Sequence, residues 1–415
     1  KLAQEAGLLM DRLVRQGRAF GMHVILGSQT LAGAYSLARS TIGQMGVRIA
    51  LQCSEADSYL ILADDNPAAR LLNRPGEAIY NDASGMLEGN NPFQVCWLDD
   101  DERIERIRAL QPRIERARHP FPPPIVFEGN APAQAKDNAE LNALIASPPT
   151  ARPASYKWHL GSPISIKEPT GASFRRRSSS NLLIVGQSED QALGMIGVGL
   201  VGLALQDAAA PAEQRSRVVL IDGTPADTPL SGLLPRIAEN TGGRVENVEY
   251  RSVAQAIGTL HADLQRRLAD ESGATGEPAV FLVIAGLQRF RSLQKGEDDF
   301  GFGGDTAGAP KPDKQLAEIV REGPAVGIHT AVWCDSAANL ERFFKRQQLG
   351  EFDARVLLQM SVNDSSNLID SPAAGSLGRD RALLFSEERG TVERFRPLAI
   401  PTDDWLAATE AAINQ

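Results

Sequence analysis

The chain has 415 residues, which is too many for one ordinary domain and suits two or three. Its 42% hydrophobic and 23% charged residues are typical of a soluble globular protein with a large core. The net charge of −9 excludes bulk attraction to nucleic acid, so binding to such a polymer would require a local basic lining.

Cysteine and hydropathy patterns exclude further classes. Cys53, Cys96 and Cys334 lie far apart, without a CxxC pair or a histidine cluster, which excludes a disulfide framework and a zinc finger. The most apolar run, 192–205, is shorter than the roughly 18 residues that suggest a membrane span. We therefore predict a cytoplasmic location and no metal site. The first residue lies inside a helical pattern, so we interpret the sequence as a fragment whose missing upstream segments would carry any membrane tether.

An internal repeat organises the chain. Residues 13–23 recur as 319–329, displaced by 306 positions, and residues 47–58 recur as 354–365, displaced by 307. Arginine, glutamine, serine and aspartate stay in register across the second block, which chance similarity between helices would not produce. Each copy has the pattern helix, Gly-x-His, strand, loop, helix, strand.

In chain order, the first copy is predicted to have strands over 24–27 and 47–52, and an alanine- and proline-rich linker follows. The second copy is predicted to have strands over 181–186, 217–222 and 278–286, helices over 189–205 and 253–268, and a mobile loop over 295–314. This alternation predicts an α/β fold with a mostly parallel sheet flanked by helices. The first copy lacks the N-terminal half that the second has. The predicted boundaries are 1–128, 129–154 for the linker, and 155–415.

The second copy has the strand and helix of a phosphate loop without its residues. Such a loop needs G-x-x-x-x-G-K-[ST], whose amides cradle phosphates, whose lysine neutralises them and whose hydroxyl binds magnesium. The corresponding positions are Gly186, Gln187, Ser188, Gln191, Ala192 and Leu193. The last three replace the second glycine, the lysine and the hydroxyl residue, and Glu189 and Asp190 would repel a triphosphate. No GK[ST] occurs anywhere in the chain, so we predict no ATP hydrolysis by it alone.

Two further nucleotide signals fail. An acidic strand that holds magnesium should end in two acids, whereas the strand over 278–286 ends in Ala285 and Gly286. Asp222 follows a different strand, so we interpret it as a loop residue. Residues 197–202 match G-x-G-x-x-G, and Asp222 lies 20 residues after Gly202, as in a dinucleotide fold. However, those glycines should directly follow a strand. Here they fall inside a predicted helix, where we expect them to allow close packing on the sheet.

The first copy resembles the FtsK/SpoIIIE/HerA family of ATPases. Residues 17–30, GRAFGMHVILGSQT, are similar to the family pattern G-R-A-x-G-I-H-L-hydrophobic-A-T-Q. VRIALQ at 47–52, SEADS at 54–58 and RPGEA at 74–78 follow in the family's order. The resemblance covers 1–85 strongly and 180–400 more weakly. It implies RecA-like P-loop NTPase modules in tandem, the first truncated and the second degenerate.

The family's ATPases are hexameric rings that pump a polymer, usually double-stranded DNA. The resemblance implies ATP and Mg²⁺ in the first module of the parent protein and none in the second, with other copies of the chain and DNA as partners. Gln29 matches the family's sensor glutamine, which reads the γ-phosphate. Arg48 is either an arginine finger acting across a subunit boundary or the partner of Asp57 in an ion pair. Asp57 and Ser58 also suit the cap of a helix.

The second copy departs from the family at the sensor as well. Asp335 stands in the place of Gln29, whereas Arg355, Asp364 and Ser365 persist. The scaffold is thus retained while the nucleotide chemistry is lost. We interpret the second copy as a catalytically inactive module that serves as a ring scaffold or a partner dock.

Two other groups of residues have competing interpretations. The run of Arg175, Arg176 and Arg177 before a strand would suit contact with the phosphate backbone of DNA, or would form an ordinary solvated loop. His23 and His329 lie next to glycine turns, and we expect them to be packed turn residues rather than catalysts.

The resulting hypothesis is that the chain is part of an ATP-driven DNA translocase. One alternative is a type VII secretion-type coupling ATPase, which would bind protein substrates. Another is a binding scaffold without catalytic activity. A DNA pump predicts salt-sensitive binding to duplex DNA, a secretion motor predicts binding of a helical peptide, and a scaffold predicts neither.

Overall fold

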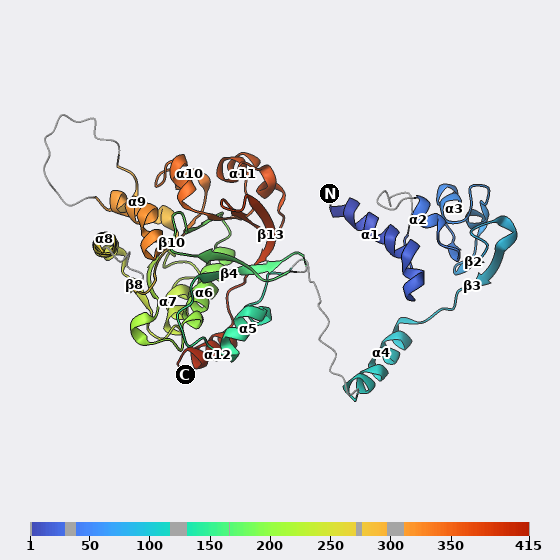
Figure 1. The fold of residues 1–415 in the computed structure, drawn as a ribbon, viewed down its shortest axis with the longest axis horizontal. Coiled ribbons are helices and arrows are strands. Elements are labelled where there is room, and N and C mark those ends of the chain that lie inside the picture. The colour runs from blue at the N-terminus through green and yellow to red at the C-terminus, as the bar shows by residue number, and fades with distance from the viewer. Residues whose placement is uncertain are drawn as a thin grey trace. The chain divides into compact units, whose positions relative to one another are not determined.

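The structure is a computed structural model that describes residues 2–29, 39–116, 131–165, 167–270, 276–296 and 311–414 (Figure 1). The chain forms two compact units, Lys1–Ile125 and Val126–Gln415, each of which is described by itself. Among the described helices, none combines the length and the apolar character that a membrane span requires. Most of the loop predicted over 295–314 lies outside the described residues.

The first unit has a small antiparallel sheet. In its described part the helices are α1 (Leu2–Gln16), α2 (Arg39–Gly43), α3 (Glu55–Ile61) and α4 (Asp100–Glu115). The strands β1 (Arg48–Leu51), β2 (Glu77–Asn81) and β3 (Asn90–Gln94) pair in that order. The strand predicted over 47–52 is confirmed. In the described part of this unit, the buried apolar cluster consists of Ala50, Leu62, Ala69, Leu72 and Ile79.

The strand predicted over 24–27 is wrong, because residues 22–28 form no regular structure. Their counterpart in the second unit is β10 (Ile328–Cys334), a central strand that pairs with parallel strands on both sides. A parallel strand needs such neighbours for its backbone N–H and C=O groups. The described residues of the first unit form antiparallel pairs only. His23 lies in this segment and is exposed, so the expectation that it is packed is also wrong.

The described part of the second unit contains one sheet of ten strands. Their order is β5-β4-β13-β12-β11-β6-β10-β9-β7-β8. The bounds are β4 (Tyr156–Pro163), β5 (Thr170–Phe174), β6 (Leu182–Val185), β7 (Arg217–Asp222), β8 (Val245–Val248), β9 (Val280–Ala285), β11 (Ala354–Leu357), β12 (Ala382–Ser386) and β13 (Thr391–Pro397). The strands from β11 to β8 are parallel, and those from β5 to β12 are antiparallel. The predicted α/β class is confirmed, with an antiparallel half that the sequence analysis did not predict.

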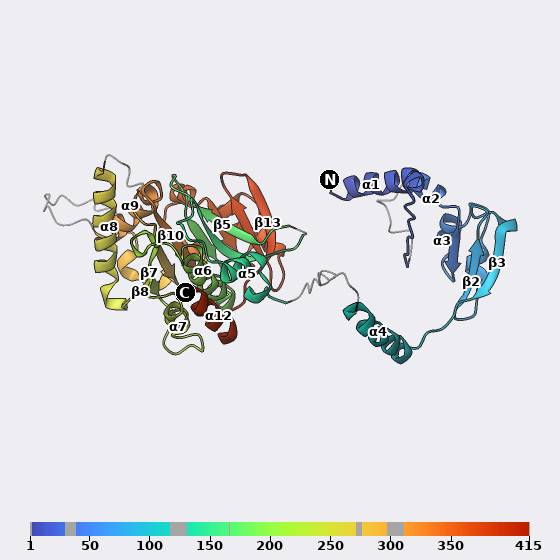
Figure 2. The same cartoon turned by 60° about the horizontal axis from the view of Figure 1, so that its bottom comes forward.

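Helices cover both faces of this sheet (Figure 2). One face packs against α5 (Ala139–Ala146), α6 (Glu189–Gln206), α7 (Leu233–Glu239) and α12 (Asp403–Ile413). The other packs against α8 (Val253–Ala269), α9 (Pro312–Glu322), α10 (Ala337–Leu340) and α11 (Val362–Ile369). The helices predicted over 189–205 and 253–268 are confirmed as α6 and α8. This three-layer arrangement buries two apolar clusters and leaves the strand ends as the natural place for a site.

The glycines of α6 allow close packing, as predicted. A Cβ atom at Gly199 would lie 2.1 Å from Cε2 of Trp158, and one at Gly194 would lie 2.4 Å from the carbonyl oxygen of Leu398. All residues of this helix from Ala192 to Gln206 are buried. The G-x-G-x-x-G match therefore lies within a buried helix and not in a turn between strand and helix.

The predicted linker is largely part of the second unit. The N–H of Ala133 donates to the carbonyl of Pro397 at 2.9 Å. Leu141 of α5 is fully buried, and Glu140 binds Lys157 of β4 at 2.6 Å. Helix α5 was not predicted because the segment is rich in alanine and proline, although Leu141, Leu144 and Ile145 have the spacing of one helical face. All three pack in or against the core.

Candidate functional site

The residues that the sequence predicts to replace a phosphate loop lie at the carboxyl end of β6. Gly186 has a φ of 146°, and a Cβ atom there would lie 2.5 Å from Cβ of Leu358. Its carbonyl accepts a hydrogen bond from Nε1 of Trp333 at 3.0 Å, and its N–H donates to the carbonyl of Cys334 at 3.1 Å. Gly186 is therefore fixed against β10 and β11, and both groups of this glycine have protein partners.

The connection between β6 and α6 is short. Only Gln187 and Ser188 separate Gly186 from the first residue of α6, Glu189. A phosphate loop needs several consecutive backbone amides that remain outside the helix and face the ligand. Here Gln191, Ala192 and Leu193 already belong to the helix. The strand passes into the helix without a loop that wraps a phosphate.

The first turn of α6 carries two acidic residues and is followed by two buried apolar residues, at the positions where the sequence analysis placed the lost phosphate loop. Ala192 and Leu193 are both fully buried in the core on the α6 face of the sheet. Glu189 and Asp190 carry carboxylates at the N-terminus of the helix, where they interact favourably with its dipole. Ser188 donates to Asp190 at 2.6 Å, and Gln191 contacts Asp380 at 3.4 Å.

The residues at the predicted sensor and acidic positions lie at the ends of neighbouring strands. β10 lies between β6 and β9, and the predicted sensor position follows β10 while the predicted acidic position ends β9. β9 ends at Ala285, and Gly286 follows with a φ of 76°. Asp335 accepts from Nδ2 of Asn339 at 2.8 and 3.1 Å. Asp222 ends β7, one strand further away, and accepts from the N–H of Thr224 at 2.9 Å, as a turn residue does.

The sensor candidate Gln29 lies at the end of the irregular segment of the first unit and is exposed. The residues that follow it, 30–38, lie outside the described part. The structure therefore brings no second nucleotide-binding position next to Gln29 among the described residues.

The repeated arginine binds one corresponding backbone carbonyl in both units. Arg48 donates to the carbonyl of Ile61 at 3.2 Å and to that of Leu62, at the end of α3. Arg355 donates to the carbonyl of Leu368 at 2.9 Å, near the end of α11. In each unit the arginine and the carbonyl it holds are 13 residues apart. Burial lowers the pKa of Arg48, and it also lowers that of Arg355.

The helix cap in each copy is a serine that the sequence analysis passed over. Ser54 accepts from the N–H of Asp57 at 3.1 Å, and its hydroxyl donates to the Asp57 carboxylate at 2.8 Å. Ser361 and Asp364 make the same two bonds at the same distances. The prediction that Asp57 and Ser58 cap the helix is wrong by three residues, because a cap precedes the first turn. The S-x-x-D pattern, which occurs at 54–57 and at 361–364, could have predicted both caps.

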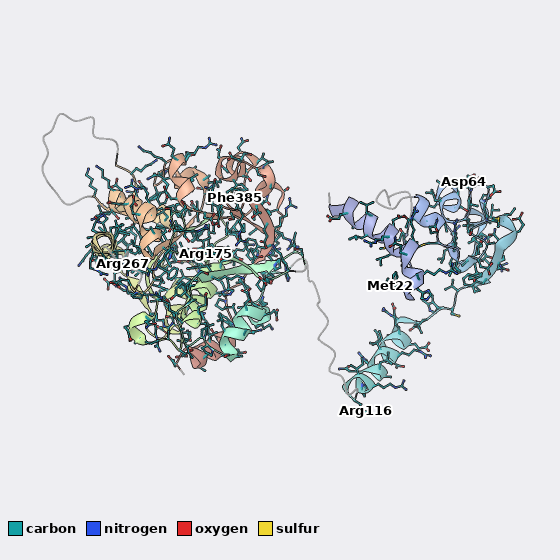
Figure 3. The ribbon with its side chains drawn as sticks, viewed as in Figure 1. Met22, Asp64, Arg116, Arg175, Arg267 and Phe385 are labelled. Carbon is teal, nitrogen blue, oxygen red and sulfur yellow. The ribbon has the colours of Figure 1, made fainter. Side chains whose placement is uncertain are left out.

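Two residues of the arginine run are used inside the unit. Arg176 donates to the carbonyls of Val326 and Glu277, and Arg177 pairs with Glu388. Arg175, which Figure 3 labels, is exposed. His329 is packed as expected, since its Nδ1 lies 2.8 Å from the carbonyl of Ser180, and burial lowers its pKa to about 4.

No family model and no curated protein sequence matches the chain. Solved structures do. The cytoplasmic domain of the type VII secretion ATPase EccC of Thermomonospora curvata matches with a TM-score of 0.54 and 15% identity, over 98% of this chain and 47% of that one. ATPases 2 and 3 of EssC from Geobacillus thermodenitrificans match with a TM-score of 0.51 and 15% identity, over 94% and 67%.

The chain has the fold of tandem FtsK/SpoIIIE-type P-loop ATPases. A third structure, EccC ATPases 2 and 3 of Thermomonospora curvata in complex with a signal sequence peptide, has a TM-score of 0.50 and 14% identity, over 95% of this chain and 65% of that one. The chain spans about half the length of the EccC cytoplasmic domain. At these identities the comparison establishes the fold, and the residues at the strand ends must carry any functional argument.

Proposed function

We propose that the second unit is a catalytically inactive module of a tandem coupling ATPase, retained as a scaffold that docks a partner. The observation that carries this proposal is the burial of Ala192 and Leu193 inside α6. These positions correspond to the lysine and the hydroxyl residue of a working phosphate loop. A lysine at 192 would have to leave the core to reach a phosphate, so the loss involves the backbone as well as the side chains.

Nucleotide binding tests this proposal. We expect the whole chain to show no saturable binding of a fluorescent ATP analogue, with or without Mg²⁺, because the connection from β6 to α6 has neither a wrapping loop nor a lysine and the sequence has no GK[ST]. An intact P-loop ATPase measured in the same buffer serves as the positive control. Saturable binding that Ser188→Glu weakens would place a nucleotide at the end of β6 and would overturn the proposal.

We further propose that the assembly moves a polypeptide rather than DNA. ATP and Mg²⁺ are used by another module of the assembly, and Gln29 contributes there as a sensor. Two observations support a polypeptide. The structures of similar fold include secretion ATPases, one of them with a signal sequence peptide. Of the three consecutive arginines, Arg176 and Arg177 bind groups of their own unit. Assembly with other copies of the chain in a ring is part of the same proposal.

Duplex DNA distinguishes the two polymers. We expect no binding of the chain to a fluorescent duplex at physiological salt, because the net charge is −9 and little free positive charge remains in the run. Fluorescence anisotropy over a salt series measures this, with amphipathic helical peptides as the competing ligands. Salt-dependent DNA binding whose slope falls by about one in Arg175→Ala would restore the DNA translocase hypothesis.

A further inference from the structure

The ten-stranded sheet of the second unit has an open edge at β8. This strand pairs with β7 alone, in parallel. The N–H of Val218 in β7 donates to the carbonyl of Arg244 at 2.9 Å, directly before β8 begins. Because alternate residues of a strand direct their backbone groups to opposite sides, those of Val245 and Asn247 face away from β7. No strand of the described residues pairs with that side, so the edge can accept one more strand.

Helix α8 lies beside this edge and makes a groove with it (Figure 2). A cavity of about 290 Å³ lies between β8 and α8. Its lining combines apolar and small polar side chains, from Val219 and Val248 in the sheet and from Gln255, Ala256, Thr259 and Leu260 in the helix. A strand added beside β8 would turn alternate side chains toward the helix. An edge strand next to a helix therefore suits an extended peptide, because the strand supplies backbone hydrogen bonds and the helix supplies side-chain contacts.

The groove is positively charged at the amino end of β8. It adjoins a second cavity of about 670 Å³, with which it shares Arg217 and Thr259. Five arginines and three carboxylates line this second cavity, although the whole chain has a net charge of −9. Two of the carboxylates, Asp263 and Glu277, bind Arg266 at 2.6 and 2.7 Å. Arg217 is exposed and pairs with no carboxylate of the described residues, so it can bind an incoming anion.

A turn of two glycines completes this end of the groove. Gly242 and Gly243 directly precede Arg244 and line the second cavity, with φ values of 65° and 75°. A Cβ atom at Gly242 would lie 2.9 Å from Cγ2 of Ile413, whereas one at Gly243 would meet no atom within 4 Å. Helix α12 thus fixes the turn, and the side of Gly243 stays open. The two amides donate to no backbone carbonyl of the described residues, and amides beside an arginine suit a carboxylate.

The opposite end of the groove is acidic. Glu246 and Glu249 line the cavity between β8 and α8, and both are exposed. A peptide whose terminal carboxylate lies at Gly243 and Arg217 would run antiparallel to β8. Its earlier residues would then pass Glu246 and Glu249, so a basic residue about three to six positions before its end would meet them.

We propose that the groove between β8 and α8 binds the C-terminal tail of a partner protein as an eleventh strand. The tail runs antiparallel to β8, its carboxylate is bound by Arg217 and the amide of Gly243, and its basic residues face Glu246 and Glu249. The inference rests on the proposed function, because it identifies where the scaffold docks its partner. A second copy paired through its own β8 edge would leave the glycine amides without a carboxylate, so it fits the groove less well.

The test probes an array of synthetic peptides with free C-termini, basic upstream residues and randomised final residues with the whole chain. We expect a subset to bind saturably, with new hydrogen-exchange protection at the amides of Val245 and Asn247. Replacing the carboxylate of a bound peptide by an amide should weaken binding at least about tenfold, because charge-assisted hydrogen bonds are lost. Arg217→Ala should weaken it to a similar extent. Arg291→Ala, at another exposed arginine outside the groove, is the matched control and should leave binding unchanged.

Asn247→Pro tests the strand pairing itself. Proline at this position removes an N–H that faces away from β7, and edge strands tolerate proline at such a position. The variant should therefore keep the thermal unfolding temperature of the unchanged chain while it binds the peptide at least about tenfold more weakly. Asn247→Ala keeps the N–H and should bind the peptide as the unchanged chain does.

Three results would overturn the inference. The first is that no peptide of the array binds in a way that depends on its carboxylate. The second is binding that Arg217→Ala and Asn247→Pro leave as strong as in the unchanged chain, which would place the contact elsewhere. The third is self-association of the whole chain that Asn247→Pro abolishes, which would make a second copy the occupant. Saturable nucleotide binding would instead contradict the proposed inactive module and would leave the peptide result standing, so the two failures are distinguishable.

Discussion

Arg355→Ala is expected to lower the free energy of unfolding of the second unit by about 2–4 kcal/mol. The Arg355 guanidinium donates from Nη2 to the carbonyl of Leu349 at 2.8 Å and from Nη1 to that of Leu368 at 2.9 Å. Its centre also lies 5.3 Å from the ring centroid of Phe385. Alanine would remove both donors. The carbonyl of Leu349 would keep the N–H of Phe352 at 3.1 Å, whereas that of Leu368 would lose its side-chain donor, and an unsatisfied buried group costs about 1–3 kcal/mol.

The ion pair of Arg355 with Glu387 adds little to that figure. Nη2 lies 2.6 Å from Oε2 of Glu387, but the Glu387 side chain is half exposed, and water screens such a pair. Arg355→Lys should recover only part of the loss, because lysine cannot reach both carbonyls with a planar fork. The expected order of stability is therefore arginine, then lysine, then alanine.

Denaturant unfolding followed by tryptophan fluorescence measures this effect. Trp158, Trp333 and Trp405 are buried in the second unit, whereas Trp97 of the first unit is exposed, so the signal reports mainly on the second unit. Arg346→Ala, which removes an exposed arginine 3.7 Å from Asp370, is the matched control and should change stability by less than about 0.5 kcal/mol. A comparably small change in Arg355→Ala would show that the arginine is free to act elsewhere.

This prediction bears on the two interpretations of Arg48 that the sequence left open. An arginine finger must reach across a subunit boundary toward a phosphate. Arg48 and Arg355 instead reach back to carbonyls at the end of the next helix of their own unit. We propose that both arginines stabilise the fold of their own unit by binding these carbonyls. An ion pair between Arg48 and Asp57 is not needed to provide the Asp57 carboxylate with a partner, because this carboxylate accepts a hydrogen bond from the Ser54 hydroxyl.

Buried runs of the sequence predicted the parallel half of the second sheet. β6, β7 and β9 are continuous apolar strands that end near glycine or aspartate, and such runs occur in sheets covered on both faces. The repeat then placed β10 and β11 correctly. Neither signal covers the antiparallel half, because β4 and β13 mix charged and apolar residues and pair with partners far away in sequence.

Two differences between prediction and structure have one physical origin, which is that the neighbours of a short segment decide what structure it adopts. Residues 24–27 have the composition of a strand and form none, because no parallel partner lies beside them among the residues that the structure describes. The stretch over 131–153 has the composition of a linker and packs through Leu141. At the candidate site, the sequence alone showed that the lysine is missing. The sequence did not predict that the loop is short, because this depends on the residue at which α6 begins.

Gly199→Ala is expected to destabilise the second unit by about 3 kcal/mol, the upper end for an inserted methyl group. The new Cβ would lie 2.1 Å from Cε2 and 2.2 Å from Nε1 of Trp158, which is far inside van der Waals contact. The indole cannot move away at low cost, because it is fully buried and donates from Nε1 to the carbonyl of Met195 at 3.0 Å. Either the helix or β4 must shift.

Gly202→Ala on the same helix is the matched control. Its Cβ would lie 3.0 Å from Nδ1 of His159, a milder contact that the higher helix propensity of alanine, about 1 kcal/mol, should roughly offset. Thermal unfolding of both variants and of the double variant Gly199→Ala, Trp158→Phe separates steric overlap from propensity, because a smaller ring should relieve the overlap. Equal stability of the two glycine variants would contradict close packing as the reason for the G-x-G-x-x-G pattern. In that case a role of these glycines in binding a ligand would have to be considered again.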